Sequence, residues 1–284
     1  MNELLKAYED VDFLKRPECR PIRLQLELLR PDLVMEEHGI RSTIVVFGSS
    51  RVMSPQEAEQ QVKELEKKLS QSPASPALKK QLLHAQKRLE QSAYYETARQ
   101  FTELICEQCQ RDDEEWKDYV VVTGGGGGIM EAGNRGAWES GAKSAGLNIS
   151  LPYEQEPNEY TTEELKFEFH YFSIRKMHFL LRARALCAFP GGLGTLDELF
   201  ETLTLIQTNK IEPMPVVLFG KEFWDRLVDW NLLVEEGLID REDLDIFRYV
   251  ETPQEAWDYI RSFWQQTAEP VPSQQKGSAG FRGD

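Results

Sequence analysis

The sequence has no long hydrophobic run, few cysteines and no signal-like start. No apolar segment approaches the roughly 18 residues that a transmembrane helix needs, so we expect no membrane partner. The four cysteines lack the spacing of a disulfide framework, which is typical of a reduced protein. Residues 1–20 are charged throughout, unlike a secretory signal peptide. Together these features predict a cytoplasmic location.

Positive charge is also scarce. The chain has 33 lysines and arginines against 48 acidic residues, a formal net charge of −15. Such a protein does not attract nucleic acid through a general positive field, so we expect no nucleic-acid partner, and any anionic ligand must be held by a local site. The histidines lack the spacing of metal ligands, and we predict neither a metal nor another cofactor; they are His38, His84, His170 and His178.

Short apolar segments alternate with helical ones along most of the chain. Strands are predicted at 42–48, 119–123, 146–151, 167–172, 185–189, 215–220 and 247–250, and late helices at 223–235 and 255–264. Strand–helix alternation of this kind predicts an α/β fold, with a doubly wound, mostly parallel, Rossmann-like sheet.

Three segments stand outside this alternation. Residues 1–41 predict a cover of short helices interrupted by prolines, ahead of a nucleotide-binding domain over 42–265. Within that domain, apolar residues at helical spacing on both sides of the break SQSPASP predict an inserted helical hairpin at about 55–111. The hairpin could be a dimer or partner contact, or a self-paired insertion that simply projects. Residues 266–284, rich in Pro, Ser, Gln and Gly, predict a disordered tail.

Two glycine-rich turns follow predicted strands and precede predicted helices. One contains Gly124, Gly125, Gly126 and Gly128, and the other contains Gly191, Gly192, Gly194 and Thr195. Backbone N–H groups at such a helix start, together with the helix dipole, favour an anion, and the hydroxyl of Thr195 could cap its helix. The first turn lacks a Gly-Lys-Ser/Thr ending, and strand 146–151 leads to Pro152, with Glu154 beyond it, where a dinucleotide site would want an acid. A phosphate ligand smaller than NAD or ATP is therefore favoured.

Charged residues are predicted to gather at the same edge of the sheet. Arg175 and Lys176 lie at the start of one predicted helix, and Glu198 lies in the first turn of the next. Ser49 and Arg51 follow the first strand, where Arg51 is either an anion contact or an exposed loop residue. Because a first-turn carboxylate is stabilised as an anion, we expect Glu198 to orient water or stabilise a cationic sugar, not to donate a proton.

Four segments carry a family resemblance: VVTGGGGGIMEAGNRGA, GLNISLP, SIRKMHF and PGGLGTLDE. They resemble the Lonely Guy (LOG) family, phosphoribohydrolases of nucleoside 5′-monophosphates that were long labelled lysine decarboxylases. The similarity spans about 42 to 219 without the hairpin, and the leading PIRLQLELLRPDL is similar to the family's extended-chain branch. The resemblance implies that Arg175 and Glu198 are catalytic, that the turn at 191–195 binds phosphate, and that the protein is a homodimer or a higher homo-oligomer.

The implied reaction is hydrolysis of the N-glycosidic bond of AMP or of a cytokinin riboside 5′-monophosphate, giving free base and ribose 5-phosphate. Phe172, Ser173 and Ile174 replace the Met-His-x of short family members near the base pocket, which leaves the preferred base open. Two alternatives are a non-catalytic carrier of a nucleotide or molybdenum cofactor, and an interaction module whose working part is the hairpin. A decarboxylase would need a pyridoxal-binding lysine, for which Lys176 is the cleft candidate.

Overall fold

A seven-stranded sheet forms the centre of the protein. The computed structural model describes residues 5–110, 115–151 and 156–267. The sheet order is β4-β3-β2-β1-β5-β6-β7, and each pair of neighbours is parallel. This confirms the predicted doubly wound fold. The strands are β1 (Thr43–Phe47), β2 (Val120–Thr123), β3 (Ser144–Ile149), β4 (Lys166–Phe169), β5 (Ala183–Ala188), β6 (Val216–Phe219) and β7 (Phe247–Val250).

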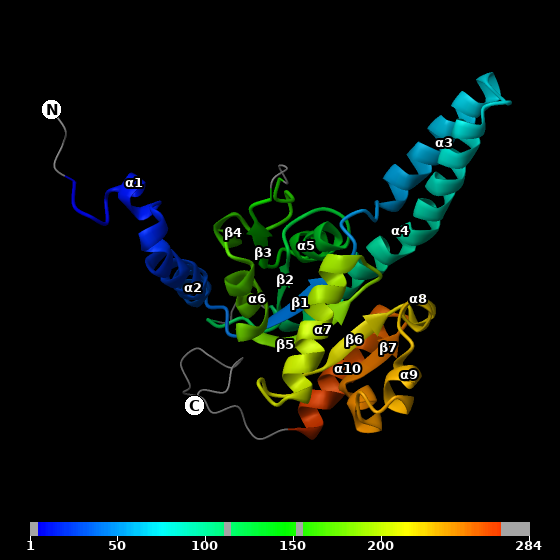
Figure 1. The fold of residues 1–284 in the computed structure, drawn as a ribbon. Coiled ribbons are helices and arrows are strands. Elements are labelled where there is room, and N and C mark those ends of the chain that lie inside the picture. The colour runs from blue at the N-terminus through cyan, green and yellow to red at the C-terminus, as the bar shows by residue number, and fades with distance from the viewer. Residues whose placement is uncertain (1–4, 111–114, 152–155, 268–284) are drawn as a thin grey trace.

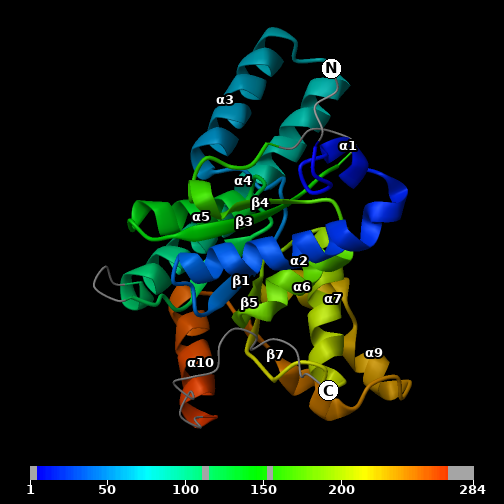
Figure 2. The same cartoon turned by 90° about the vertical axis from the view of Figure 1, so that its left-hand side faces the viewer.

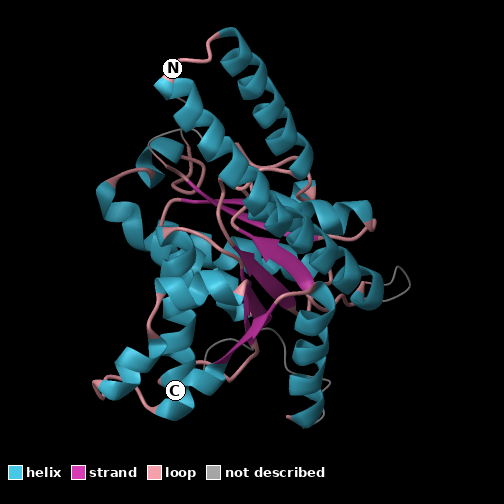
Figure 3. Ribbon diagram, turned by 90° about the vertical axis from the view of Figure 1, so that its right-hand side faces the viewer, coloured by secondary structure: helices cyan, strands magenta, loops and turns pink. Residues whose placement is uncertain are grey.

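Helices cover both faces of the sheet (Figures 1 and 3). The longer ones are α2 (Arg20–Glu37), α3 (Pro55–Gln71), α4 (Pro76–Cys109), α5 (Ile129–Glu139), α6 (Phe172–Leu181), α7 (Leu193–Gln207) and α10 (Pro253–Gln266). The shorter elements are α1 (Val11–Leu14), α8 (Lys221–Leu227), α9 (Trp230–Glu235) and the 3₁₀ turns Pro17–Cys19, Glu163–Leu165 and Arg241–Ile246. Of the described helices, none is long and apolar enough to cross a membrane.

Successive side chains along the strands point alternately into two separate hydrophobic cores. In β1, Val45 and Phe47 face a core shared with α2, α6 and α7, whereas Ile44 and Val46 face one shared with α4, α5 and α10. The same period of two recurs in β5 and β6. Because both faces are buried, the strands read as continuous apolar runs, which is why the sequence predicts them well.

Two predicted elements end in the wrong place. The single helix predicted over 223–235 is α8 and α9, separated where the Asp229 side chain accepts a hydrogen bond from Leu232 N and caps the second helix. The strand predicted over 167–172 ends at Phe169, and Phe172 instead begins α6. The apolar pattern alone does not show the cap at Asp229, which begins a second helix, or the turn after Phe169, which ends the strand.

The prediction of short, proline-interrupted N-terminal helices is wrong at Pro31. Helix α2 runs through Pro31 for 18 residues. Proline cannot donate to the carbonyl four residues earlier, which here belongs to Glu27. His178 of α6 replaces the missing donor, since its Nε2 lies 3.1 Å from Glu27 O. The Glu27 carboxylate also accepts the backbone N–H groups of His170 and Tyr171 at 3.0 and 3.1 Å, so α2 holds the turn that leads into α6.

Helices α3 and α4 form an antiparallel hairpin that projects from the sheet (Figure 1, cyan). Ser54 and Ser75 cap the two helices. The second arm continues into the domain, where Phe101 is fully buried beneath the sheet and Gly136 of α5 lets the backbone of α4 approach closely. Figure 2 shows the hairpin rising from the domain and α2 crossing in front of the sheet. Of the predicted disordered tail, 268–284 lies outside the described residues.

Candidate active site

The order of the strands marks one edge of the sheet as a binding site. The chain lays β2, β3 and β4 on one side of β1 and then crosses to place β5, β6 and β7 on the other. In open parallel sheets, ligands bind outside the carboxyl ends of the strands where this reversal occurs. Here the reversal lies between β1 and β5. The turns after β1, β2 and β5 meet at that edge.

Ser49, directly after β1, joins both glycine-rich turns through its backbone. Its N–H donates to Pro190 O at 3.1 Å, and its carbonyl accepts from Ile129 N at 3.1 Å. Ser49, predicted from the sequence as a binding residue, therefore lies at the switch point, where its backbone joins the two turns. Arg51 is exposed, and its N–H donates to Ser49 Oγ at 3.1 Å.

The run of glycines at 124–128 allows very close packing. Gly128 has a φ of +67°, and a Cβ there would lie 2.3 Å from Ser49 O. Gly125 has a φ of +73°, and a Cβ there would lie 2.4 Å from Asn148 Oδ1. Both the left-handed backbone and the lack of space require glycine at these two positions.

A buried amide network holds this run, and the sequence analysis missed it. Thr123 Oγ1 donates to Asn134 Oδ1 at 2.7 Å and accepts from Gly125 N at 3.0 Å. Asn158 Nδ2 lies 2.9 Å from Asn134 Oδ1 and 3.0 Å from Gly126 O. An asparagine among the small residues of EAGNRGA was the available signal, because a buried amide needs polar partners.

The turn at 191–195 is open on the side where an anion could lie. Helix α7 begins at Leu193 with Gly192 as its N-cap, so the prediction that Thr195 caps the helix is wrong. Thr195 is buried and turned back, with Oγ1 only 2.1 Å from where a Cβ on Gly191 would stand. At Gly192 and Gly194 a Cβ would meet nothing within 4 Å. The first turn of α7 holds no acidic residue that would repel an anion.

Arg175 lies against the first glycine of the run at 124–128. It is one turn inside α6, not at its start as predicted. Its Nε donates to Leu147 O at 2.8 Å, and its guanidinium carbon lies 5.2 Å from the centre of the Phe179 ring. A Cβ on Gly124 would be 2.7 Å from Arg175 Nη2, which places the guanidinium at the mouth of the first turn.

Glu198 is buried, and this changes its expected ionisation. It lies in the second turn of α7, beyond the first-turn position that the sequence analysis assigned to it, and is 8% exposed. Burial raises the pKa of Glu198 to about 7, although Lys176 and Arg175 each act to lower it. The expectation of a carboxylate held ionised by the helix dipole is therefore wrong. Removal from water outweighs the nearby cations.

Lys176 joins the two helices that carry Arg175 and Glu198. Its Nζ lies 2.9 Å from Asp197 Oδ1 and 3.1 Å from Glu201 Oε2. Burial alone would lower the pKa of Lys176, but the hydrogen bonds to these carboxylates raise it. The predicted phosphate contact through Lys176 thus competes with two carboxylates. Lys176 is also poorly suited to forming an aldimine with pyridoxal, because the attacking amine must be neutral and these carboxylates favour the charged form of Lys176.

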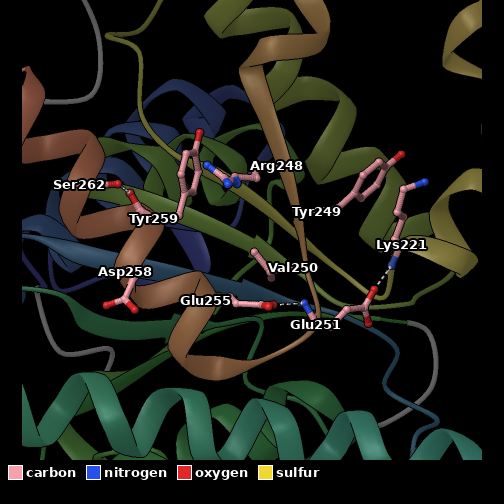
Figure 4. Close-up of a pocket in the computed structure, with 9 residues that line it drawn as sticks. All are labelled: Lys221, Arg248, Tyr249, Val250, Glu251, Glu255, Asp258, Tyr259 and Ser262. Carbon is pink, nitrogen blue, oxygen red and sulfur yellow. Dashed lines mark hydrogen bonds between the residues drawn. The ribbon is translucent and has the colours of Figure 1, made fainter.

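A separate hollow of about 600 Å³ lies between β7 and α10, away from the glycine turns (Figure 4). Lys221 N donates there to Glu251 Oε1 at 3.0 Å, and Glu251 N donates to Glu255 Oε2 at 2.9 Å. Two of its carboxylates thus accept backbone N–H groups. Within the described ranges, no group of three His, Cys, Asp or Glu side chains could hold a metal ion.

The fold and these turns define a doubly wound α/β protein with two glycine turns at the switch point. A family model described as "Possible lysine decarboxylase", the older label of the LOG family, matches residues 130–260. The rice (Oryza sativa subsp. japonica) protein "Probable cytokinin riboside 5′-monophosphate phosphoribohydrolase LOG4" is 31% identical over 132 residues, which are 45% of this chain and 56% of that protein. The chain therefore spans little more than half of this curated relative. With the motifs above, these matches support a resemblance of the chain to the LOG family.

Two solved structures also resemble the chain, each at 21% identity. One is the X-ray structure of TM1055, a structural genomics target, which covers 78% of this chain and 99% of its own at a TM-score of 0.47. The other is a molybdenum cofactor binding protein from the phototrophic bacterium Rippkaea orientalis, which covers 60% and 87% at a TM-score of 0.41.

Proposed function

We propose that the protein hydrolyses the N-glycosidic bond of a nucleoside 5′-monophosphate, such as AMP or a cytokinin riboside 5′-monophosphate. The products are the free base and ribose 5-phosphate. The main support is that Arg175 and the buried Glu198 influence each other's ionisation at the edge where the glycine turns meet. The similarity to LOG-family proteins supports the same reaction.

In this proposal the turn at 191–195 binds the 5′-phosphate. Its open side at Gly192 and Gly194 leaves room for phosphate oxygens, and the N-terminus of α7 supplies backbone N–H groups and a favourable dipole. Binding energy from the phosphate then positions the reacting sugar carbon. Arg175, beside Gly124, neutralises phosphate charge or contacts the ribose.

Glu198 acts on the sugar and on the attacking water. Cleavage gives the sugar oxocarbenium character, which a nearby carboxylate stabilises. With a pKa of about 7, Glu198 is present in both protonation states near neutral pH, so its carboxylate form can accept a proton from water. Activity should therefore rise with pH through about 7.

The test is incubation with a panel of nucleoside 5′-monophosphates, followed by chromatography for free base and an assay for ribose 5-phosphate. Release of both in equal amounts by the wild type, and not by Glu198→Gln, supports the proposal. The matched control Glu90→Gln changes an exposed helical carboxylate and should keep full activity. Nucleotide binding without any base release favours the carrier alternative. A cytoplasmic location and a homodimer are part of the same proposal.

A further inference from the structure

The hollow between β7 and α10 runs along the side of a strand that has no neighbour there. Strand β7 is last in the sheet order, and among the described strands it pairs with β6 alone. The hollow of about 600 Å³ is lined by four consecutive residues, 248–251. Successive side chains of a strand point to opposite faces, as Arg248 and Tyr249 do in Figure 4. A hollow that meets all four residues therefore lies along the side of the strand, and we call it the β7 groove.

The backbone of Tyr249 directs its hydrogen-bonding groups into the β7 groove. Val250 O accepts from Gly220 N at 3.1 Å, directly after β6, so the backbone groups of Val250 face β6. These groups alternate from side to side along a strand, so those of Tyr249 face away from β6. Within the described part of the chain, no hydrogen bond to them is found. Unpaired N–H and C=O groups at the side of a sheet are a template on which another strand can pair.

Helix α10 forms the second wall of the β7 groove, with one face at positions 255, 258, 259 and 262. The Glu255 carboxylate closes one end, because it accepts the N–H of Glu251 at 2.9 Å. Along the groove, the guanidinium carbon of Arg248 lies 5.2 Å from the centre of the Tyr259 ring. A strand paired with Tyr249 would thus lie between β7 and α10. Addition of a strand to the side of a sheet is a recurring way in which proteins bind extended peptides.

The charges of the β7 groove favour a basic partner. Three carboxylates and two cations line it. One of the cations, Lys221, is paired with Asp225. The other, Arg248, then faces all three carboxylates, and the surplus is negative, as it is for the whole chain at −15. An extended peptide with cationic side chains is therefore attracted, whereas an acidic peptide or a second copy of the same groove is repelled.

We propose that the β7 groove binds an extended basic peptide of another protein, which pairs with the backbone of Tyr249 as an additional strand. The cationic side chains of the peptide lie against the carboxylates of Glu251 and Asp258. The groove lies away from the glycine turns, so this goes beyond the proposed reaction and does not depend on it.

The test compares two synthetic peptides, acetyl-TKTKTKT-amide and acetyl-TETETET-amide, by calorimetry with the full chain. The basic peptide should bind at least about tenfold more tightly than the acidic one. Tyr249→Pro removes the N–H that faces the groove and leaves the bonds to β6 in place, so it should weaken binding of the basic peptide at least about tenfold. Tyr249→Ala is the matched control, because it loses the same ring but keeps the N–H. It should bind at least about tenfold more tightly than the proline variant.

Reversal of a carboxylate on α10 tests the charge argument without touching the strand. Asp258→Lys should weaken the basic peptide at least about threefold. Glu90→Lys, at an exposed position on the hairpin, should not. Hydrogen exchange followed by mass spectrometry locates the contact, since the basic peptide should slow exchange in residues 247–251. Circular dichroism establishes that each variant is folded.

Several results would overturn the proposal. Equal binding of the two peptides, or binding of neither at about 1 mM, removes the basic partner. Full binding by a folded Tyr249→Pro protein removes the backbone pairing. Slow exchange of residues 247–251 without peptide would show that the chain itself already covers the groove. A loss of mass on light scattering in Tyr249→Pro, relative to wild type, would assign the groove to a second copy.

Discussion

Replacing Glu198 with glutamine should remove activity and, at alkaline pH, increase stability. Glutamine has the shape of the protonated carboxyl but cannot ionise. If the carboxylate stabilises the sugar cation and activates water, kcat should fall by roughly 10²–10⁴. The same buried position makes the ionised carboxylate costly for the folded protein, so loss of function and gain of stability should come from one atom change.

The size of the stability effect follows from the burial of Glu198. The side chain is 8% exposed, and burial raises its pKa from the ordinary 4.5 to about 7. This rise in pKa lowers the free energy of unfolding by about 3 kcal/mol once the carboxyl group is fully ionised. A carboxyl whose folded pKa is raised favours the folded state below its unfolded pKa. That contribution is lost as the pH rises through about 7.

The assay is urea unfolding of wild type and Glu198→Gln at pH 5 and pH 8. The free energy of unfolding of the variant, relative to wild type, should increase by about 2 to 3 kcal/mol between these two values. Other titrating groups, such as the buried His178, affect both proteins alike and cancel in the difference. Glu90→Gln, at an exposed position, should show no such pH dependence.

Two results would refute this reasoning independently. Near-normal turnover of AMP by a folded Glu198→Gln protein would show that the carboxylate has no chemical role. A stability difference that does not change between pH 5 and pH 8 would show that burial does not raise its pKa. The first result would leave the electrostatics of the site intact, and the second would leave the reaction intact.

Three further predictions concern the surroundings of Glu198. Lys176→Met removes a cation that lowers the pKa of Glu198, so the acidic limb of the kcat–pH profile should move up by about one pH unit, whereas Lys221→Met should not move it. Gly192→Ala adds a Cβ on the open side of the turn, where the phosphate is proposed to bind, so KM for AMP should rise at least about tenfold. Thermal stability should not fall, because this Cβ meets no protein atom within 4 Å. Gly191→Ala should lower stability, because its Cβ meets the Thr195 side chain. Asn134→Ala leaves buried partners unsatisfied and should cost about 1 to 3 kcal/mol in urea unfolding, compared with no loss for exposed Gln100→Ala.

The strands and their common edge could be predicted from the sequence because both depend on local pattern. A run such as TIVVF in β1 is apolar throughout since both of its faces are covered. Parallel strands then necessarily return every following turn to one edge. The left-handed backbone at Gly125 and Gly128 is also a local feature, because glycine adopts a positive φ readily.

The errors arose where a distant residue decides the outcome. Pro31 looks like a helix breaker until His178, far along the chain, supplies the donor that proline lacks. Glu198 looks like an ionised helix-start carboxylate until its burial in the folded chain is known. The phosphate contact of Lys176 stays a prediction, but the sequence did not show that Asp197 and Glu201 lie beside its Nζ.

The contacts of Glu27 join the N-terminal helix α2 to the segment around α6. The Glu27 side chain accepts the N–H groups of His170 and Tyr171 directly before α6, and the Glu27 backbone carbonyl accepts from His178, one turn beyond Arg175. Removal of residues 1–41 would leave these three donors without their acceptors on Glu27. The N-terminal helix α2 therefore fixes the position of the chain where it enters α6, the helix that carries Arg175.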